Sequence, residues 1–152
     1  MKRDPALASL SRDHHRALFV AQALRRATAE TAGEARTAFL TYWEHHGQAH
    51  FRLEEQVLLP SYAGYGDSHH PLVARVLCDH VEIRYRADRL AGEDPPTLDA
   101  LHRLGLRLAE HVRLEERELF PLIESALPAD RLAALAVAME RAEQQERLPE
   151  DE

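Results

Sequence analysis

The stretch His50-Phe51-Arg52-Leu53-Glu54-Glu55-Gln56-Val57-Leu58-Leu59-Pro60 is nearly repeated 61 residues later as His111-Val112-Arg113-Leu114-Glu115-Glu116-Arg117-Glu118-Leu119-Phe120-Pro121. Seven of the eleven positions are identical. In each copy a histidine precedes a glutamate by four residues, and on a helix this spacing puts both side chains on one face, about one turn apart. Each pair can therefore reach one metal ion, and two pairs in one short chain predict a site for two metals.

A second, shorter repeat accompanies the first. Asp13-His14 matches Asp79-His80, 66 residues further along the chain. The chain thus reads as two related helical hairpins. Packed face to face about a pseudo-two-fold axis, they would bring their inward histidines to a common centre.

Length and composition indicate a single domain over residues 1–152, long enough to bury one core. The ten histidines stand out against a single cysteine, Cys78, which cannot form an internal disulfide and fits a reducing compartment. No segment has the length of a signal peptide or of a membrane span, so we expect a cytoplasmic protein with no membrane partner. The net charge of −7, with arginines scattered among glutamates, disfavours nucleic acid as a partner.

Apolar residues recur at helical spacing through most of the chain, with no alternating strand pattern. Pro60 is expected to end the second helix, and Thr97 to cap the fourth. Short connections predict an all-α fold, an antiparallel up-down four-helix bundle over about residues 5–124 with an additional short C-terminal helix. The expected helices cover residues 5–28, 34–59, 71–90, 97–123 and 129–146, the third beginning between 68 and 71.

The C-terminal helix carries one apolar stripe, formed by Leu132, Leu135, Ala136 and Met139. Such a stripe must be covered. It is expected to pack against the outside of the bundle or against another subunit, which makes a homodimer through this helix possible. From Arg147 onward the chain is expected to lose its helical structure.

Helical periodicity selects the inward histidines. His14 falls at the edge of the apolar face of the first helix, whereas His15 falls on the opposite side and is kept as an alternative. The other histidines outside the set below, at positions 45, 69, 70 and 102, are expected at the surface or at helix ends. The predicted ligand set is His14, His46, His50, Glu54, His80, His111 and Glu115.

The chemistry of this set points to metal binding. One histidine on an apolar face is usually a satisfied core residue, but seven inward histidines and glutamates arranged in duplicate are hard to explain in that way. Zinc usually takes four ligands, so seven favour two metals. Imidazole and carboxylate suit iron, manganese or zinc, and a histidine-rich set with an open position favours iron. Glu55 and Glu116, beside the ligand glutamates, are expected to support ligands or to face solvent.

The pattern resembles the hemerythrin-like (HHE cation-binding) domain family over residues 10–124. Four features carry the resemblance: the histidine of the first helix, the His-x-x-x-Glu of the second, the histidine of the third, and the His-x-x-x-Glu of the fourth, which is followed by Phe120-Pro121. The resemblance implies two iron ions bridged by Glu54, Glu115 and an oxo or hydroxo group. It also implies terminal ligation by histidines 14, 50, 80 and 111.

The sequence departs from the family's oxygen carriers in the third helix. Those carriers have a second histidine one turn from the first, but Val76 and Arg84 stand at the two corresponding positions around His80. His46 is therefore a candidate replacement ligand. An iron left more open would favour reaction with oxygen over its storage.

Together these observations predict a di-iron protein that binds or senses oxygen, or a related small oxidant such as peroxide or nitric oxide. One alternative is a redox-defence enzyme that decomposes peroxide or oxidises iron. Another is an interaction module in which iron occupancy controls docking of the C-terminal helix.

Overall fold

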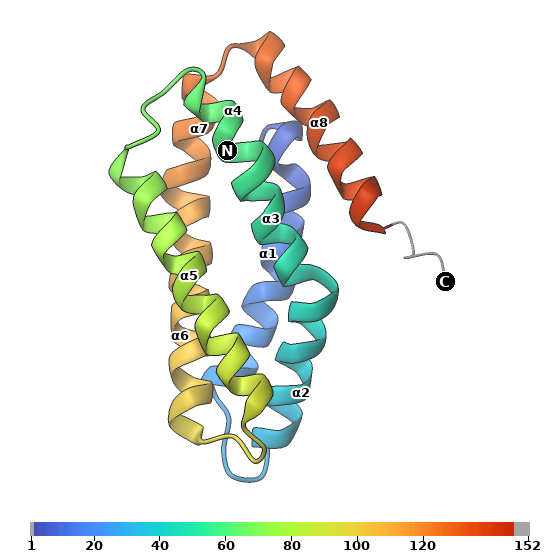
Figure 1. The fold of residues 1–152 in the computed structure, drawn as a ribbon, viewed down its shortest axis with the longest axis vertical. Helices are drawn as coiled ribbons and strands as arrows, with labels where there is room; N and C mark the ends of the chain where they lie inside the picture. The colour runs from blue at the N-terminus through green and yellow to red at the C-terminus, as the bar shows by residue number, and fades with distance from the viewer. Residues whose placement is uncertain (1, 148–152) are drawn as a thin grey trace.

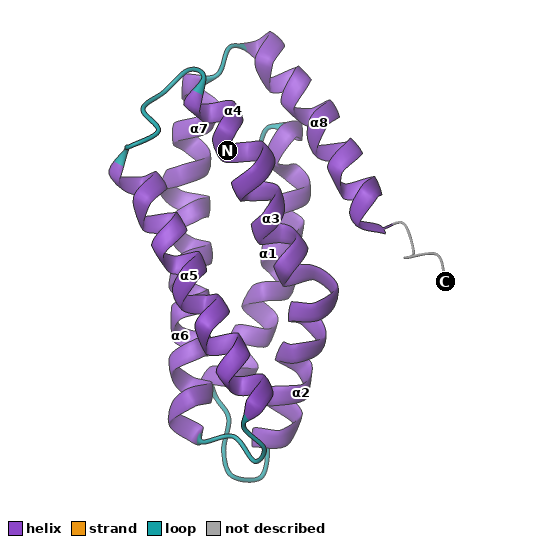
Figure 2. Cartoon of the chain, in the orientation of Figure 1, coloured by secondary structure: helices purple, strands orange, loops and turns teal. Residues whose placement is uncertain are grey.

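The computed structural model describes residues 2–147, and in this part of the chain helices are joined by loops, with no strand (Figures 1 and 2). It forms five continuous helical segments, three of which are single helices. The other two contain π-helical turns, labelled η. In order, the elements are α1 (Pro5–Arg25); α2 (Ala32–Tyr42), η1 (Trp43–Gly47), α3 (Gln48–Leu53), η2 (Glu54–Leu58) and α4 (Leu59–Ala63); α5 (Pro71–Gly92); α6 (Leu98–Leu114), η3 (Glu115–Leu119) and α7 (Phe120–Ala126); and α8 (Ala129–Arg147).

Side-chain caps set several helix ends. The Asp4 carboxylate accepts a hydrogen bond from the Ala6 amide at 2.9 Å, and Thr97 Oγ1 accepts one from the Ala100 amide at 3.1 Å, as expected for Thr97. The first helix ends at Arg25, earlier than predicted. Thr31 Oγ1 accepts from the Thr28 amide at 2.9 Å, and this local bond offers the backbone an alternative to another helical turn.

The prediction that Pro60 ends the second helix is wrong, because the helical segment continues to Ala63. A proline interrupts an α-helix since it lacks an N–H and its ring collides with the preceding turn. Here the turn before Pro60 is the wider η2, in which the Leu59 amide bonds to the Glu54 carbonyl. Pro60 then lies in the first turn of α4, where no N–H is required. The repeat behaves identically: η3 precedes Pro121.

The apolar core is divided into two clusters by a polar layer. On α1, Leu10 belongs to one cluster and Ala17 to the other, with His14 between them. On α5, Val76 and Ile83 flank His80 in the same way. The histidines and glutamates predicted from the repeats therefore lie in the middle of the bundle, away from bulk water.

The apolar stripe of α8 packs on the bundle of the same chain. Leu135 and Met139 are each only 2% exposed and join the cluster that contains Leu7 and Leu10 of α1. Arg52 of α3 donates two hydrogen bonds to the Glu146 carboxylate, at 2.9 and 2.7 Å. Of the two expected positions for this helix, the structure thus shows the one against the bundle. Arg147, where helical structure was expected to be lost, still belongs to α8, and the rest of the expected tail lies outside the described residues.

No helix within residues 2–147 combines the length and the apolar character needed to cross a membrane.

Candidate metal centre

Six of the seven predicted ligands meet in the polar layer at the middle of the bundle. They fall into two groups. Within each group the potential ligand atoms all lie within 4.8 Å of one another. Glu54 and Glu115 belong to both groups and are fully buried. The first group adds His14 and His50; the second adds His80 and His111. The arrangement therefore consists of two histidine pairs joined by two shared carboxylates.

The polar atoms that face the centre have no hydrogen-bond partner. These atoms are Nε2 of all four histidines and both carboxylate oxygens of Glu54 and Glu115. Short approaches do occur, such as 3.2 Å between His50 Nε2 and Glu54 Oε1 and 2.7 Å between His111 Nε2 and Glu115 Oε1, but their angles are not those of hydrogen bonds. Unpaired buried polar atoms cost several kcal/mol, on the order of 2–7 each, unless something else binds them. Four nitrogens and four oxygens converging in this way fit bound metal ions.

The outer nitrogen of each histidine has a carboxylate partner, and this explains both sequence repeats. Asp13 Oδ2 accepts from His50 Nδ1 at 3.3 Å, and Asp79 Oδ2 accepts from His111 Nδ1 at 3.1 Å. Each aspartate of the Asp-His repeat thus orients the histidine of the other helix in its own hairpin. An Nδ1–H held by a carboxylate leaves Nε2 as the free donor atom for a metal.

The second glutamate of each repeated segment performs the same role across the hairpins. Glu55 Oε2 accepts from His80 Nδ1 at 2.6 Å, and Glu116 Oε1 accepts from His14 Nδ1 at 2.7 Å. Both glutamates thus contact predicted ligand histidines, which agrees with one of the two roles expected for them. The aspartates were noted in the sequence only as markers of the repeat.

An arginine and a phenylalanine complete each cross-hairpin contact. Arg84 donates to Glu55 at 2.7 and 3.2 Å, and its guanidinium lies 5.5 Å from the ring centre of Phe51. Phe51 in turn stacks on His80, with ring centres 3.8 Å apart and planes inclined by 7°. The carboxylate, the arginine and the aromatic ring together fix the orientation of this imidazole.

The other half of the bundle repeats this arrangement. Arg3 donates to the Glu116 carboxylate at 3.1 Å and lies 5.5 Å from the ring centre of Phe120. Phe120 stacks on His14 at 5.4 Å with planes inclined by 8°. Phe120 and Phe51 occupy different positions in the repeated segments, so sequence alignment of the repeats did not reveal their equivalence.

Burial and charge act in opposite directions on the histidines. Burial lowers the pKa of His14 and of His111 more than their carboxylate partners raise it. Burial also lowers the pKa of His50, but the negative charge of Glu54 and the hydrogen bond with Asp13 outweigh it and raise the pKa to about 10. Burial raises the pKa of Glu54, yet His50 and His80 hold it well below its usual value. The centre thus keeps Glu54 anionic.

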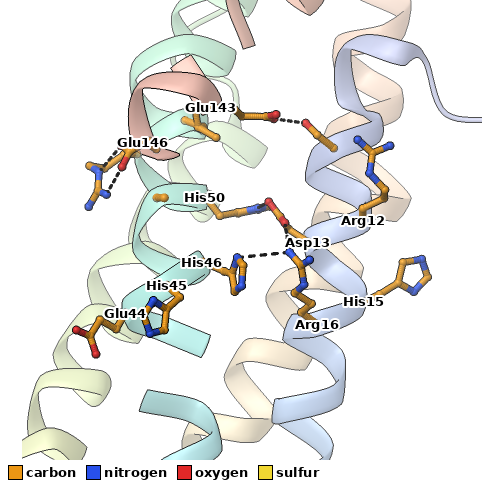
Figure 3. A pocket seen from close by; sticks show the side chains of 14 residues that line it. Arg12, Asp13, His15, Arg16, Glu44, His45, His46, His50, Glu143 and Glu146 are labelled. Atoms are coloured by element: carbon orange, nitrogen blue, oxygen red, sulfur yellow. Dashed lines mark hydrogen bonds and ion pairs between the residues drawn. The ribbon is translucent and has the colours of Figure 1, made fainter. Parts of the chain in front are cut away.

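His46 is the predicted ligand that the structure does not bring to the centre, and we correct that expectation. At this turn Trp43 and Gly47 take the buried side. A Cβ on Gly47 would lie 2.5 Å from Trp43 Cε3, so only glycine leaves room for the indole ring. His46 is displaced toward α1, where its Nδ1 lies 3.4 Å from Arg16 Nη1 (Figure 3). His15, the alternative to His14, is exposed and points away from the centre (Figure 3).

The two positions one turn from His80 on α5, where a further histidine could have stood, hold side chains with other roles. Val76 is fully buried in the apolar cluster, and the Arg84 side chain is directed to Glu55. Neither side chain is a metal ligand. The two groups of the centre therefore have equal numbers of histidines, two in each.

A helical bundle with a buried histidine–carboxylate centre defines a class of metal-binding proteins. Comparison of the sequence gives the family: the hemerythrin HHE cation-binding domain matches residues 6–123, and the chain belongs to that family. The chain is also 37% identical over 76 residues to the serine–tRNA ligase of Beutenbergia cavernae. That overlap covers 46% of this chain and only 18% of the ligase, so it carries no argument about activity. No solved structure matches the chain significantly.

Proposed function

We propose that this protein is a non-haem di-iron protein that binds or senses oxygen, or a related small oxidant such as peroxide or nitric oxide. The observation that carries the proposal is the convergence of four unpaired histidine nitrogens and four unpaired carboxylate oxygens in a buried layer. The proposal includes an antiparallel up-down arrangement of the four long helical segments, which their short connections favour. A cytoplasmic location also belongs to it, since Cys78 is a free thiol.

In this proposal each of the two groups would supply the ligands of one metal. Glu54 and Glu115 would bridge; His14 and His50 would hold one iron, and His80 and His111 the other. Four protein residues would hold each iron, and an ion that takes six ligands would keep room for solvent, for an oxo or hydroxo group and for a small ligand. When bound, the two irons supply ligand coordination and electrons to the oxidant.

The protein residues supply orientation, anionic charge and exclusion of water. The Asp13 and Asp79 carboxylates fix the ring orientation of His50 and His111, so that only Nε2 is available at the centre. Glu54 stays anionic and can neutralise cationic charge. The two apolar clusters close the layer from both ends of the bundle and keep bulk water out. Such a site favours a small ligand over a large organic substrate.

Iron content tests the assignment directly. Purified protein loaded anaerobically with ferrous iron should hold about two irons per chain. The double variant His50→Ala/His111→Ala should lose this iron, whereas the matched double variant His45→Ala/His69→Ala, in which both histidines are exposed, should retain it. Full iron retention by the first variant would refute the assignment.

Reactivity separates the members of this functional class. Anaerobic reduction followed by addition of oxygen should produce the visible absorption of an oxidised, bridged ferric pair in wild-type protein and not in the iron-free double variant. Binding of oxygen without turnover would support a carrier or sensor. Sustained consumption of peroxide, or sustained oxidation of added ferrous iron, would instead support a redox-defence enzyme.

A further inference from the structure

A pocket of about 450 Å³ lies between α1 and α6, and no residue of the metal centre lines it. We call it the arginine pocket. Among the described residues, its lining consists of Leu18, Gln22, Arg25, Arg26, Ala109 and Arg113. Three of these are arginines and none is acidic, although the whole chain has 26 acidic residues against 19 basic ones. The pocket is therefore a local positive site on an acidic protein.

The charges of these arginines are not neutralised inside the protein. Within residues 2–147, no carboxylate lies within ion-pair distance of Arg25, Arg26 or Arg113. Other arginines of α6 do have such partners: Arg103 pairs with Asp99, and Arg107 pairs with Glu82 and Glu110. The positive charge of the arginine pocket thus remains available to a ligand.

Packing holds two of the three arginines in place. The stem of Arg25 lies against α6 at Gly105, where a Cβ would come within 2.8 Å of Arg25 Cγ. Gln22 holds Arg26: with the amide turned so that its oxygen accepts, Nη1 and Nη2 of Arg26 both donate to it at 3.0 Å. A guanidinium has more N–H groups than these two bonds use, so Arg26 keeps donors for a ligand. Side chains that are already oriented lose less entropy when they bind an anion.

Helix ends do not account for all three arginines. Arg25 and Arg26 lie in the last turn of α1 and at its cap, where cations interact favourably with the terminal carbonyl groups. Arg113 has no such terminus beside it, because the helical segment continues from α6 through η3 into α7. The convergence of Arg113 with the arginines of another helix on one pocket is therefore the observation that indicates a ligand.

The number of guanidiniums indicates the class of ligand. Arginine pairs best with phosphates and carboxylates, which accept two parallel hydrogen bonds from its fork of N–H groups. A single phosphate monoester carries about −1.5 to −2 near neutral pH, so two guanidiniums neutralise it. Three therefore match a more highly charged anion, with two adjacent phosphate groups. The volume of about 450 Å³ falls in the range of small-molecule sites, roughly 300–1,000 Å³.

We propose that the arginine pocket binds a diphosphate group, either as inorganic diphosphate or as part of a small organic diphosphate. Arg25 and Arg113 hold the group from the two helices, and Arg26 supplies the third cation. Leu18 and Ala109 form the apolar part of the lining, against which the organic part of a ligand can pack. The site is independent of the metal centre, since the two have no residue in common.

A nucleic acid fits this site less well than a small diphosphate does. A phosphate backbone is bound by a row of cations along its length. On α6 the row does not continue beyond the pocket, because Arg103 and Arg107 are already paired with carboxylates. The available cations are confined to one pocket of small-molecule size.

The test compares two double variants that remove the same charge. Arg25→Gln/Arg113→Gln removes two cations of the arginine pocket, whereas Arg75→Gln/Arg141→Gln removes two exposed arginines that lie outside it. Neither variant changes a residue of the metal centre. Binding of inorganic diphosphate, ADP and citrate to the full chain is measured by isothermal titration calorimetry at low ionic strength. No divalent metal is added, because diphosphates chelate such ions, and iron content is measured before and after each titration.

We expect wild type to bind one diphosphate per chain, the pocket variant to bind it at least tenfold more weakly, and the control variant to match wild type. Tighter binding of ADP than of inorganic diphosphate would support an organic diphosphate as the ligand, and equal or weaker binding of ADP would support the inorganic ion. The proposal would be overturned by no saturable binding to wild type, by equal affinities in all three proteins, by equal losses in both variants, or by citrate binding as tight as that of diphosphate.

A single substitution serves as a second test that puts less strain on folding. Arg113→Gln changes one exposed side chain of the pocket, and Arg117→Gln, four residues further along and also exposed, is its control. Circular dichroism and the thermal midpoint establish that each variant is folded. We expect Arg113→Gln to weaken diphosphate binding about fivefold or more and Arg117→Gln to leave it unchanged. Unchanged binding by folded Arg113→Gln would contradict the proposal.

Discussion

Glu55→Gln removes one negative charge beside a proposed ligand while keeping the size and shape of the side chain. In the native protein the Glu55 carboxylate accepts from His80 Nδ1 at 2.6 Å and from Arg84 at 2.7 and 3.2 Å. A glutamine offers one acceptor oxygen to these two donors, and its NH₂ group faces a donor. The variant therefore loses the charge-assisted bond that orients His80 and leaves Arg84 without its carboxylate.

The expected effect is a 10- to 100-fold weaker affinity for metal, the usual loss on changing a residue that supports a ligand histidine, or about 1.4–2.7 kcal/mol. Affinity is measured by competition with a fluorescent chelator, using ferrous iron without oxygen and then manganese, and circular dichroism confirms the fold. Glu118→Gln is the matched control, since Glu118 is exposed on η3. An affinity of Glu55→Gln within about twofold of wild type, or an equal loss in the control, would refute the reasoning.

Further predictions concern the ligands, packing and protons. His46→Ala should leave the iron content and visible spectrum of the loaded protein unchanged, because His46 lies outside both ligand groups; a changed spectrum would restore it as a ligand. Gly105→Ala should destabilise the protein by about 1–3 kcal/mol, because a Cβ there would lie 2.7 Å from the Ala21 carbonyl oxygen. The loss is measured as a lower thermal midpoint. In the control Gly33→Ala the new Cβ meets nothing within 4 Å, so the midpoint should not fall. Metal loading near neutral pH should release protons. Burial lowers the pKa of His50, but Glu54 and Asp13 outweigh burial and raise this pKa to about 10. His50 is therefore protonated before loading, and a proton must leave when its Nε2 binds metal. A pH indicator in weak buffer measures this release, and a smaller one is expected for Asp13→Asn.

Much of the centre could be predicted because its ligands follow the period of a helix. Spacing by four residues relates His50 to Glu54 and His111 to Glu115, and both pairs lie in the buried layer as expected. Periodicity also placed His14 toward the core and His15 toward solvent, as the structure shows. These predictions needed only the helical angle per residue and the rule that polar groups in a core require partners.

Predictions failed where the helix departs from that angle or where packing decides. The helix continues past Pro60 because a π-helical turn precedes the proline. The prediction assumed an even rotation of about 100° per residue, and that assumption cannot reveal π-helical turns. His46 was misplaced because the Trp43 ring, packed over Gly47, takes the buried side of its turn. The carboxylate partners of the histidines could not be paired from sequence, since Asp13 contacts a residue 37 positions away and Glu116 one 102 positions away. Such contacts depend on which helices become neighbours.

The two halves of the centre are related by the repeat but differ electrostatically. Arg16 donates to Asp13, whereas Glu82 stands at the corresponding position, 66 residues later, and no arginine of the described chain contacts Asp79. Asp79 therefore interacts with His111 as an unneutralised carboxylate, while the charge of Asp13 is shared with a cation at the surface. The pKa of His50 is raised, but burial holds that of His111 low. The two histidine pairs are therefore equal in number, but their electrostatic surroundings differ, because the carboxylates outweigh burial at His50 whereas burial dominates at His111.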